Sequence, residues 1–554
     1  MSWPVSELEQ SPQPRRVPPP SQAEATTVMR ALPPRGSAEE TTFLSAASKS
    51  APWPPPEPPR AAPRRVGPQD DDKPEPEPEP APRRSRRKPV LITLIALVAV
   101  VGVAAGVVFF VPGLSDRLGL TSAEPVATAP PPAPVNFEPG LRAPDAAAPA
   151  PSPGGVAAAL AGPTSDGGLG NLTGTVVDPA TGQTLWENGA NTPLVPASTT
   201  KILTAAAALL SLDPTEELVT KVVEGANPGE VIIVGGGDLT VSSLEPGQES
   251  VYPGAAYLSD LVEQVRASGV TVNSVKVDLT LYKGDSLAPG WLPADINANG
   301  VGYITRMAPV MLDGDRSDEP KNVDGVRTGN PGRHIAEAFA SRIGASVPGT
   351  VETTAPADAR VLGEIRSAPL VELVYNMLTT SDNMLAEVVA HEVARGAGQE
   401  VSFAGGATAT MNLLRENGFN VDGAQLSDGS GMSTQNQVPA RLLAEILSVA
   451  AAPDGDDPRT AKLRPLLAGL PVAGGTGTLD DAHNRFNESG TAAARGWARA
   501  KTGTLSGVNS LAGIVLDKDG RLLVFALMTS DSVSTTARPA LDAIVAALRG
   551  CGCQ

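Results

Sequence analysis

The sequence predicts an α/β (α+β) fold in which an antiparallel sheet carries helices on its faces, with a large inserted domain and a single N-terminal transmembrane helix. A hairpin pattern at residues 172–187 is followed by an Ala-rich helical pattern at 202–212. Outside the inserted domain, strand patterns return only after residue 498. Strands at both ends of a region with helices between them are typical of a sheet covered by helices. The membrane helix is predicted from an uncharged apolar run at 90–111.

Composition limits the class of protein and its partners. The chain has 554 residues, 55 of them Pro, and a formal net charge of −17. No basic stripe occurs in the globular part, so we expect no nucleic-acid partner. Cys551 and Cys553 stand in the last residues of the chain, and their spacing is poor for an unstrained bridge. We therefore interpret residues 550–554 as a tail, with intermolecular pairing as the alternative.

The N-terminal part is predicted to hold the chain in a membrane. Residues 1–88 are Pro-rich without an apolar period, which indicates a disordered tail. Residues 90–111 would reach roughly 33 Å as a helix, enough to span the hydrocarbon core. Basic residues crowd its N-terminal side at 83–88, so the positive-inside rule places the tail in the cytoplasm and the rest outside. We expect a single-pass protein of the cell membrane with its catalytic part extracytoplasmic.

The tail contains two similar short segments with paired threonines, Thr26/Thr27 and Thr41/Thr42, each in an acidic context. Chance similarity explains them, but phosphorylation of a disordered tail would create a site for Arg clusters on another protein. A cytoplasmic phosphothreonine-binding partner therefore stays open as a hypothesis.

Residues 112–168 are rich in Pro, Ala and Gly and are predicted to form a flexible linker, followed by a catalytic domain at 169–549. The helices and strands of this domain are interrupted by an insertion at about 215–365. Its own strand patterns at 231–234 and 275–281 and a helical pattern at 255–267 predict a separately folded region.

Ser198 and Lys201 are the first pair of candidate catalytic residues. They lie one turn apart at the start of the apolar helix, so they share a face. A buried amine loses the preference for its charged form and can take a proton from the serine hydroxyl. The pattern Ser-x-x-Lys is weak alone, because it also occurs in the basic run at 85–88.

Two later motifs strengthen the interpretation. Ser381-Asp382-Asn383 stands between helical patterns at 370–378 and 384–395, and Lys501-Thr502-Gly503 lies in a strand pattern. The order Ser-x-x-Lys, Ser-Asp-Asn, Lys-Thr-Gly is that of penicillin-binding proteins and β-lactamases. Separately, each residue has a structural explanation as a helix cap, turn former or solvated strand residue.

Metal chemistry is not predicted. His391-Glu392 starts like a zinc-protease motif, but Arg395 stands where its second histidine would be. We therefore expect no metal site and no cofactor.

With these motifs, the sequence resembles the D-alanyl-D-alanine carboxypeptidase/endopeptidase family, the class C low-molecular-mass penicillin-binding proteins. The resemblance covers about 169–549 and includes the long insertion and the Gly-Gly-Gly-Asp and Asp-Gly-Ser-Gly segments at 235–238 and 428–431. It implies a serine penicilloyl-transferase, β-lactamase-like fold.

The resemblance also implies roles for the motif residues. Ser198 would attack a D-Ala-D-Ala type bond of a peptidoglycan stem peptide while Lys201 takes its proton, and β-lactams would acylate the same serine. Ser381 and Lys501 would pass a proton to the leaving amine, and Asn383 would hold the donor amide. Thr502 and Thr504 would bind the terminal carboxylate, with Gly503 between them in the same substrate-binding segment. The backbone N–H groups of Ser198 and Thr504 would form the oxyanion hole.

Other functions stay open at this point. Carboxypeptidase and endopeptidase action differ in what lies beyond the cleaved bond, so the motifs do not separate them. A β-lactamase-like hydrolase is disfavoured by the insertion. A non-catalytic wall-binding or signalling anchor is disfavoured by the complete set of motifs.

Overall fold

The structure is a computed structural model that describes residues 148–296, 301–317, 323, 325–455 and 457–553. The predicted tail at 1–88 with its threonines, the membrane helix at 90–111 and the first part of the linker all lie outside these residues. Among the described helices, none is long and apolar enough to cross a membrane.

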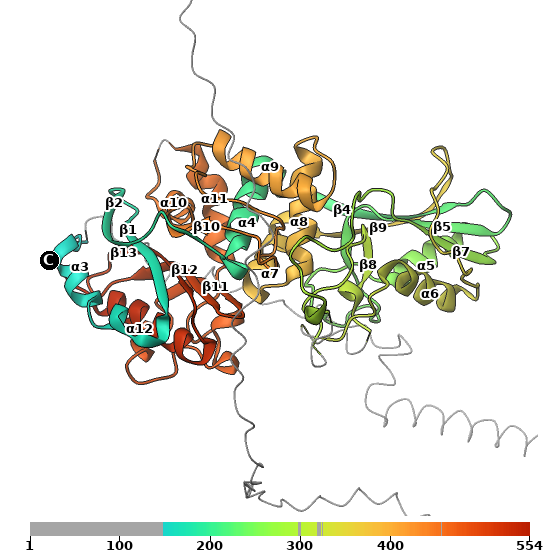
Figure 1. Cartoon of the computed structure of the whole chain (residues 1–554). Coiled ribbons are helices and arrows are strands. Elements are labelled where there is room, and N and C mark those ends of the chain that lie inside the picture. The colour runs from blue at the N-terminus through green and yellow to red at the C-terminus, as the bar shows by residue number, and fades with distance from the viewer. Residues whose placement is uncertain (1–147, 297–300, 318–322, 324, 456, 554) are drawn as a thin grey trace, which may run out of the picture. The chain divides into compact units, whose positions relative to one another are not determined.

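A five-stranded antiparallel sheet forms the centre of the catalytic region, in the order β11-β12-β13-β1-β2 (Figure 1). Its first two strands in sequence are the predicted hairpin, and its other three come from the last part of the chain. Along β11, Lys501 pairs with Ala512 and Gly503 with Ser510. The strands are β1 (Asn171–Asp178), β2 (Gln183–Asn188), β11 (Ala498–Leu505), β12 (Val508–Leu516) and β13 (Leu522–Ser530).

Helices cover both faces of this sheet because its central strand alternates apolar side chains. On β13, Leu523, Phe525 and Leu527 belong to one buried cluster, which includes residues of α3 (Pro153–Leu160) and α12 (Ser534–Gly550). Val524 and Ala526 belong to a second cluster on the other face. Strand residues that alternate between faces produce two cores. This confirms the predicted sheet with helices on its faces.

The second cluster is built mainly from helices. Nearly every residue of α4 is buried, as the Ala-rich pattern predicted. These helices are α4 (Thr200–Ser211), α7 (Leu370–Thr380), α8 (Asn383–Gly396), α9 (Phe403–Glu416), α10 (Ala440–Ala451) and α11 (Pro458–Gly469). Short elements join them: β3 (Pro193–Leu194), β10 (Val438–Pro439), η3 (Ala197–Thr199), η6 (Gly477–Leu479), η7 (Asp481–His483) and η8 (Ala492–Ala494).

The inserted region has a sheet and an apolar core of its own. A four-stranded sheet in the order β7-β5-β4-β9 packs against α5 and α6, and β6 pairs with β8. The predicted strand at 275–281 is shorter and ends at Asp278. The elements are β4 (Glu217–Glu224), β5 (Glu230–Val234), β6 (Asp238–Val241), α5 (Leu258–Ala267), β7 (Ser274–Asp278), η4 (Pro293–Asp295), β8 (Val310–Leu312), η5 (Asp313–Asp315), α6 (Pro331–Ile343) and β9 (Val361–Pro369).

The predicted linker at 112–168 is wrong over its last part. Within it, the side chain of Ser152 accepts the Gly155 N–H at 3.1 Å and caps α3, whose Val156 and Leu160 are fully buried. Two further short helices follow, η1 (Pro163–Ser165) and η2 (Gly167–Leu169). A high content of Pro, Ala and Gly concealed a helix that is held in place by its Ser152 cap and by the burial of Val156 and Leu160.

The prediction of a free tail at 550–554 is also wrong. The structure joins Cys551 and Cys553 in a disulfide, and Cys551 is buried in the cluster beside α12. The Ser152 N–H donates to the Cys553 carbonyl oxygen at 2.6 Å. The end of the chain therefore packs on the first described helix.

Candidate active site

Ser198 lies on the short turn that leads into the buried helix α4. The hydroxyl groups of Thr199 and Ser510 both donate to the Pro196 carbonyl oxygen at 2.7 Å and hold this turn. Gly503 on β11 permits the close approach, because a Cβ atom there would lie 3.0 Å from the Ser198 nitrogen. The nucleophile is thus fixed between a helix and the edge strand of the sheet.

Lys201 is the neighbour of the Ser198 hydroxyl. Its Nζ lies 3.0 Å from Ser198 Oγ and donates to Asn383 Oδ1 at 2.8 Å and to the Ser430 carbonyl oxygen at 2.7 Å. The side chain is fully buried. Burial lowers the pKa of the Lys201 amine to about 8, although the carboxylates of Asp428 and others act in the opposite direction. Near neutral pH a useful fraction is therefore neutral and able to accept a proton.

Ser381 occupies the corner between α7 and α8. It adopts a left-handed backbone conformation, with φ of 63°, which directs it back toward the sheet. Lys501 Nζ donates to Ser381 Oγ at 2.8 Å and to the Thr502 carbonyl oxygen at 2.9 Å. Burial, and then the charge of Lys201, lowers the pKa of Lys501 well below its usual range. The two lysines thus serve two different hydroxyl groups.

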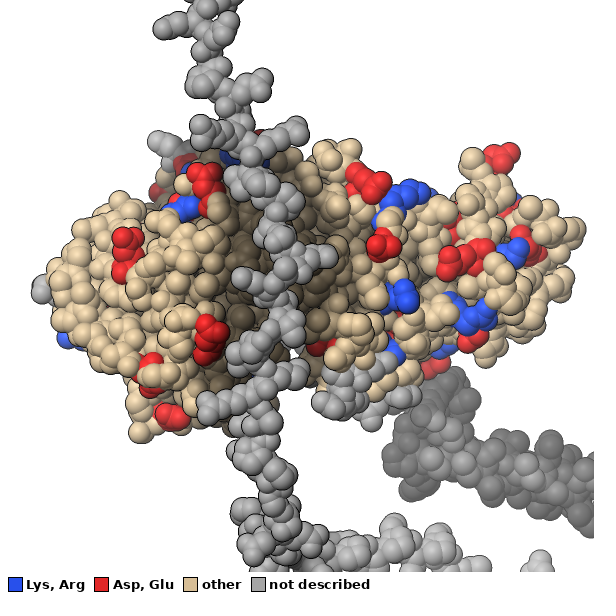
Figure 2. Space-filling model, viewed as in Figure 1, with Lys and Arg blue, Asp and Glu red and all other residues tan. Residues whose placement is uncertain are grey.

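A cavity of about 690 Å³ opens over these groups. Ser198, Ser381 and Asn383 line it from the helices, and Thr502 and Thr504 line it from β11. The inserted region contributes apolar side chains that are about half exposed, Leu292 and Tyr303. Gly503 does not line the cavity. On the face shown in Figure 2, charges of both signs are interspersed over the inserted region and no large basic patch is seen.

The comparisons with known proteins agree with this geometry. Residues 156–325 and 316–548 match the model of the D-Ala-D-Ala carboxypeptidase 3 (S13) family. The chain belongs to this family. It is 43% identical to "Carboxypeptidase DacB" of Mycolicibacterium smegmatis over 477 residues. The aligned part is 85% of this chain and 98% of the relative. It is 27% identical over 447 residues to "D-alanyl-D-alanine carboxypeptidase" of an Actinomadura species, covering 66% of this chain and 78% of the relative.

A solved structure shows the same fold. The crystal structure of penicillin binding protein 4 (dacB) from Haemophilus influenzae covers 71% of this chain and 97% of its own, with a TM-score of 0.56 at 19% identity. The family match and the mycobacterial relative confirm the predicted resemblance, and this S13 chain is a serine-type D-Ala-D-Ala carboxypeptidase by family.

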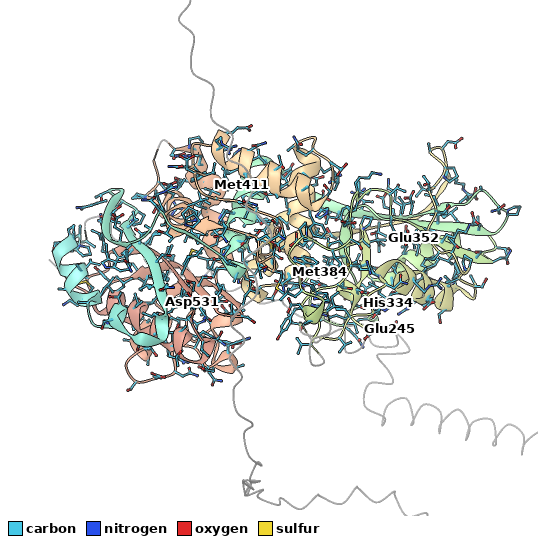
Figure 3. The ribbon with its side chains drawn as sticks, viewed as in Figure 1. Glu245, His334, Glu352, Met384, Met411 and Asp531 are labelled. Atoms are coloured by element: carbon cyan, nitrogen blue, oxygen red, sulfur yellow. A yellow bond between two sulfur atoms is a disulfide. The ribbon has the colours of Figure 1, made fainter. Side chains whose placement is uncertain are left out.

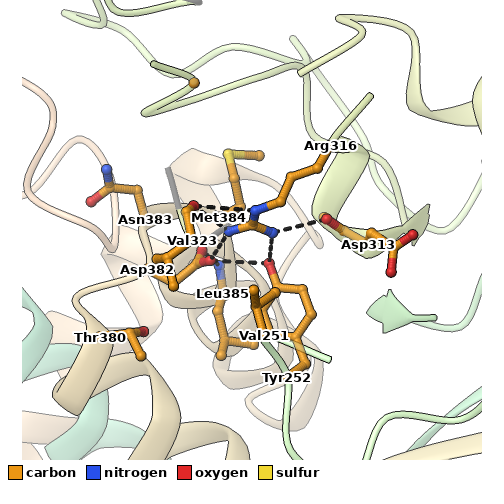
Figure 4. Close-up of polar contacts among 12 residues, drawn as sticks. Val251, Tyr252, Asp313, Arg316, Val323, Thr380, Asp382, Asn383, Met384 and Leu385 are labelled. Atoms are coloured by element: carbon orange, nitrogen blue, oxygen red, sulfur yellow. Dashed lines mark hydrogen bonds and ion pairs between the residues drawn. The ribbon is translucent and has the colours of Figure 1, made fainter. Parts of the chain in front are cut away.

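The inserted region holds the second motif of this S13 chain through Asp382 (Figure 4). The Asp382 carboxylate accepts Tyr252 Oη at 3.0 Å and Arg316 Nη2 at 3.0 Å, and its other oxygen accepts the Leu385 N–H at 2.9 Å. Burial would raise the pKa of Asp382, but the charges of Arg316 and Arg327 outweigh it and hold the pKa at about 2. Asp382, the middle residue of Ser-Asp-Asn, therefore forms a buried ion pair with Arg316 that joins α8 to the inserted region.

Two further contacts link the inserted region to α8. Asn383 Nδ2 donates to the Tyr303 carbonyl oxygen at 3.1 Å, while Asn383 Oδ1 accepts from Lys201. This pair of contacts fixes which end of the amide faces the lysine. Met384, which Figure 3 places between the inserted region and the helices, accepts the Thr305 N–H on its sulfur at 3.4 Å.

Glu387 and the loop at 428–433 position the Ser430 carbonyl oxygen that accepts a hydrogen bond from Lys201. Both oxygens of the buried Glu387 accept backbone N–H groups, from Gly429 at 2.9 Å and from Ser430 at 2.8 Å. This fixes the Ser430 carbonyl that accepts from Lys201. Burial, and then the charge of Asp428, raises the pKa of Glu387 to about 8.

Most predicted site residues come together, and a few functional neighbours were missed. Hydrogen bonds join Ser198, Lys201 and Asn383 in one group and Ser381 and Lys501 in another. The Asp-Gly-Ser-Gly segment at 428–431 was predicted only as part of the family resemblance, without a role in the site. Sequence reasoning missed three residues that belong to no motif: Tyr252, Arg316 and Glu387. It also missed Thr478, whose hydroxyl lies 2.7 Å from that of Thr502, and the contact of the Ser430 carbonyl with Lys201.

Proposed function

We propose that the protein is a serine DD-peptidase that cleaves D-alanyl-D-alanine type bonds of peptidoglycan stem peptides through an acyl-enzyme. One observation carries the proposal: Ser198 Oγ and Lys201 Nζ are 3.0 Å apart, and burial lowers the pKa of the amine to about 8. A serine hydroxyl at its free pKa is a poor nucleophile, and a neighbouring neutral amine removes this limitation.

In the acylation step, Ser198 Oγ bonds to the carbonyl carbon while its proton passes to Lys201. The bond from carbon to the leaving nitrogen then breaks, and this amine receives a proton through Ser381, which is in contact with Lys501. Asn383 orients the donor peptide, and Thr502 and Thr504 take the terminal carboxylate. Backbone N–H groups of Ser198 and Thr504 hold the oxyanion. Water then attacks the ester, restores the Ser198 hydroxyl and releases the shortened peptide.

The same geometry supports acylation by β-lactams, whose amide carbonyl would occupy the position of the cleaved bond. The test is to incubate the full chain with a fluorescent penicillin, digest it and map the label by mass spectrometry, in parallel with an assay for released D-alanine. Label on Ser198 together with D-alanine release supports the proposal. Label on another residue, or no D-alanine from a pentapeptide ending in D-Ala-D-Ala, contradicts it.

We also propose that residues 90–111 anchor the protein in the cell membrane with the catalytic region outside. The uncharged run and the basic residues before it support this orientation. Protease added to intact, wall-stripped cells should degrade residues after 112 and spare the tail. Protection of the catalytic region in that experiment would overturn the orientation.

The paired threonines at 26–27 and 41–42 lead us to propose a phosphothreonine-dependent partner in the cytoplasm. Mass spectrometry of the protein from its native membrane should find phosphate there. Absence of phosphate across growth conditions would contradict this proposal.

A further inference from the structure

Ser381 has a backbone conformation that needs support from its neighbours. It is not a glycine, yet it adopts the left-handed conformation, with φ of 63° and ψ of 27°. A residue persists in this sparsely populated conformation only where the surrounding structure fixes it. On one side, Ser381 Oγ accepts a hydrogen bond from Lys501 Nζ at 2.8 Å. On the other side, the support comes through the next residue, Asp382.

The Asp382 carboxylate is divided between two regions of the chain. Its Oδ1 accepts the Leu385 N–H at 2.9 Å and caps α8. Its Oδ2 accepts from Tyr252 Oη and from Arg316 Nη2 of the inserted region, both at 3.0 Å (Figure 4). Any rotation of the Ser381 backbone that carries Asp382 along would therefore break contacts with the inserted region.

Arg316 is held more firmly than an ion pair alone requires. Its side chain has no exposed surface. All five of its N–H donors have acceptors. Nε and Nη2 donate to the Val323 carbonyl oxygen at 3.1 Å and 2.7 Å. Nη1 donates to the Asp313 carbonyl oxygen at 2.8 Å and to Tyr252 Oη at 2.7 Å, and Nη2 also donates to Asp382. A buried guanidinium in such a completed network is fixed in one orientation.

Asn383, the third residue of the motif, is anchored independently. Its Nδ2 donates to the Tyr303 carbonyl oxygen at 3.1 Å, and its Oδ1 accepts from Lys201 Nζ at 2.8 Å. These contacts do not pass through Asp382. Loss of the contacts of Asp382 with the inserted region would therefore displace Ser381 before it displaces Asn383.

We propose that Arg316 and Tyr252 are positioning residues for catalysis: through Asp382 they keep the Ser381 hydroxyl on Lys501 Nζ. This inference rests on the proposed function, in which Ser381 passes a proton to the leaving amine. Neither positioning residue lines the cavity. The inserted region thus contributes to the rate of the chemical step from outside the substrate site.

Two variants of the full chain remove this support in different ways. Tyr252→Phe removes one hydrogen bond to Asp382 and keeps the ring. The double variant Arg316→Met with Asp382→Asn removes both charges, so no buried charge is left unpaired, and an Asn at 382 can still cap α8. We expect both variants to melt near the wild-type temperature.

The first measurement is the release of D-alanine from a pentapeptide that ends in D-Ala-D-Ala. We expect kcat to fall about tenfold in Tyr252→Phe and about a hundredfold in the double variant, while KM stays within about twofold. A displaced hydroxyl slows proton transfer but leaves the substrate contacts in place. The rate constant of acylation by a fluorescent penicillin should fall by similar factors.

Ser381→Ala separates this positioning role from a purely structural one. If Arg316 and Tyr252 act through the Ser381 hydroxyl, their loss matters little once that hydroxyl is absent. In the Ser381→Ala background, each change should therefore lower the acylation rate constant by less than about twofold. Labelling is followed over hours, so that slow variants are measured. A purely structural role would give the same factors in both backgrounds.

A matched control is the buried ion pair of Arg521 with Asp178, at 2.7 Å. It joins the end of β1 to the residue before β13, and neither residue lines the cavity. Arg521→Met with Asp178→Asn removes this pair by the same two substitutions. We expect kcat in this control to stay within about twofold of wild type.

The outcomes separate this inference from the proposed function. If both variants keep kcat within about twofold, if their losses are equal in the Ser381→Ala background, or if the control loses as much, the positioning role is wrong and the proposed function stands. If the double variant does not fold, Tyr252→Phe decides by the same criteria. If wild-type protein releases no D-alanine and takes up no penicillin, the proposed function fails and this inference fails with it.

Discussion

Acylation of Ser198 should rise with pH around pH 8, because Lys201 accepts a proton only as a neutral amine. With a pKa of about 8, roughly 10% of the amine is neutral at pH 7. If the amine had the ordinary lysine pKa of about 10.4, only roughly 0.04% of it would be neutral at pH 7. Burial of Lys201 therefore increases the neutral fraction at pH 7 by a factor of about 250, which exceeds the loss in base strength that accompanies a lower pKa.

The assay is the second-order rate constant of acylation by a fluorescent penicillin, measured by stopped flow between pH 6 and pH 10. The rate should rise about tenfold per pH unit below pH 7 and level off above pH 9. Thermal melting at each pH verifies that the fold persists over this range. A flat profile, or a rise centred above pH 10, would refute the role given to Lys201.

Glu387 requires a control, because burial raises its pKa to about 8 as well. In Glu387→Gln the rise should persist at the wild-type midpoint or below it, because the charge of Glu387 favours protonated Lys201. Disappearance of the rise in this variant would assign the titration to Glu387 instead.

Four further predictions concern the nucleophile, the close approach of Gly503 to its turn, and the ion pair of Asp382 with Arg316. Ser198→Ala should abolish covalent penicillin labelling without lowering the melting temperature, since little core volume is lost; undiminished labelling would contradict the assignment. Gly503→Ala would place a Cβ atom 2.7 Å from Pro196 O, and the displaced turn should slow acylation about a hundredfold, measured by stopped flow. Asp382→Asn leaves Arg316 buried without its partner, so urea unfolding should show a loss of about 3–5 kcal/mol. In wild type, the depressed pKa of Asp382 means that this pair stabilises the fold above about pH 4 and loses its effect as pH falls through about 2, which acid titration by circular dichroism can test.

The sequence predicted those parts of the site that local chemistry determines. Ser198 and Lys201 share a helix face, so their contact follows from helical geometry alone. The hairpin and the late strands followed from alternation and turn residues. The meeting of Ser381 with Lys501 depended on the order of motifs, because 120 residues separate them and no local rule joins them.

The supporting residues could not be predicted because they act through distant or backbone atoms. Arg316 precedes Asp382 by 66 residues and lies in the inserted region, where its only sequence property is charge. The acceptor at Ser430 is a backbone carbonyl, which no side chain reveals. Glu387 was concealed within an apolar helical pattern, where a buried acid is ordinarily unexpected.

The junction of α3 with the end of the chain determines how the catalytic region can be cut for laboratory use. A fragment that begins at residue 169 would lack Val156 and Leu160, each contributing roughly 1.5–3 kcal/mol by burial. It would also leave the carbonyl of Cys553 without its partner at Ser152 and expose an apolar surface that promotes aggregation. The contact is close, since a Cβ atom on Gly155 would lie 2.6 Å from the Cys553 oxygen, so we expect a tag at the C-terminal end to disturb it. Soluble fragments should therefore begin before Ala148, whose carbonyl accepts from Arg521, and should carry their tag at the N-terminal end.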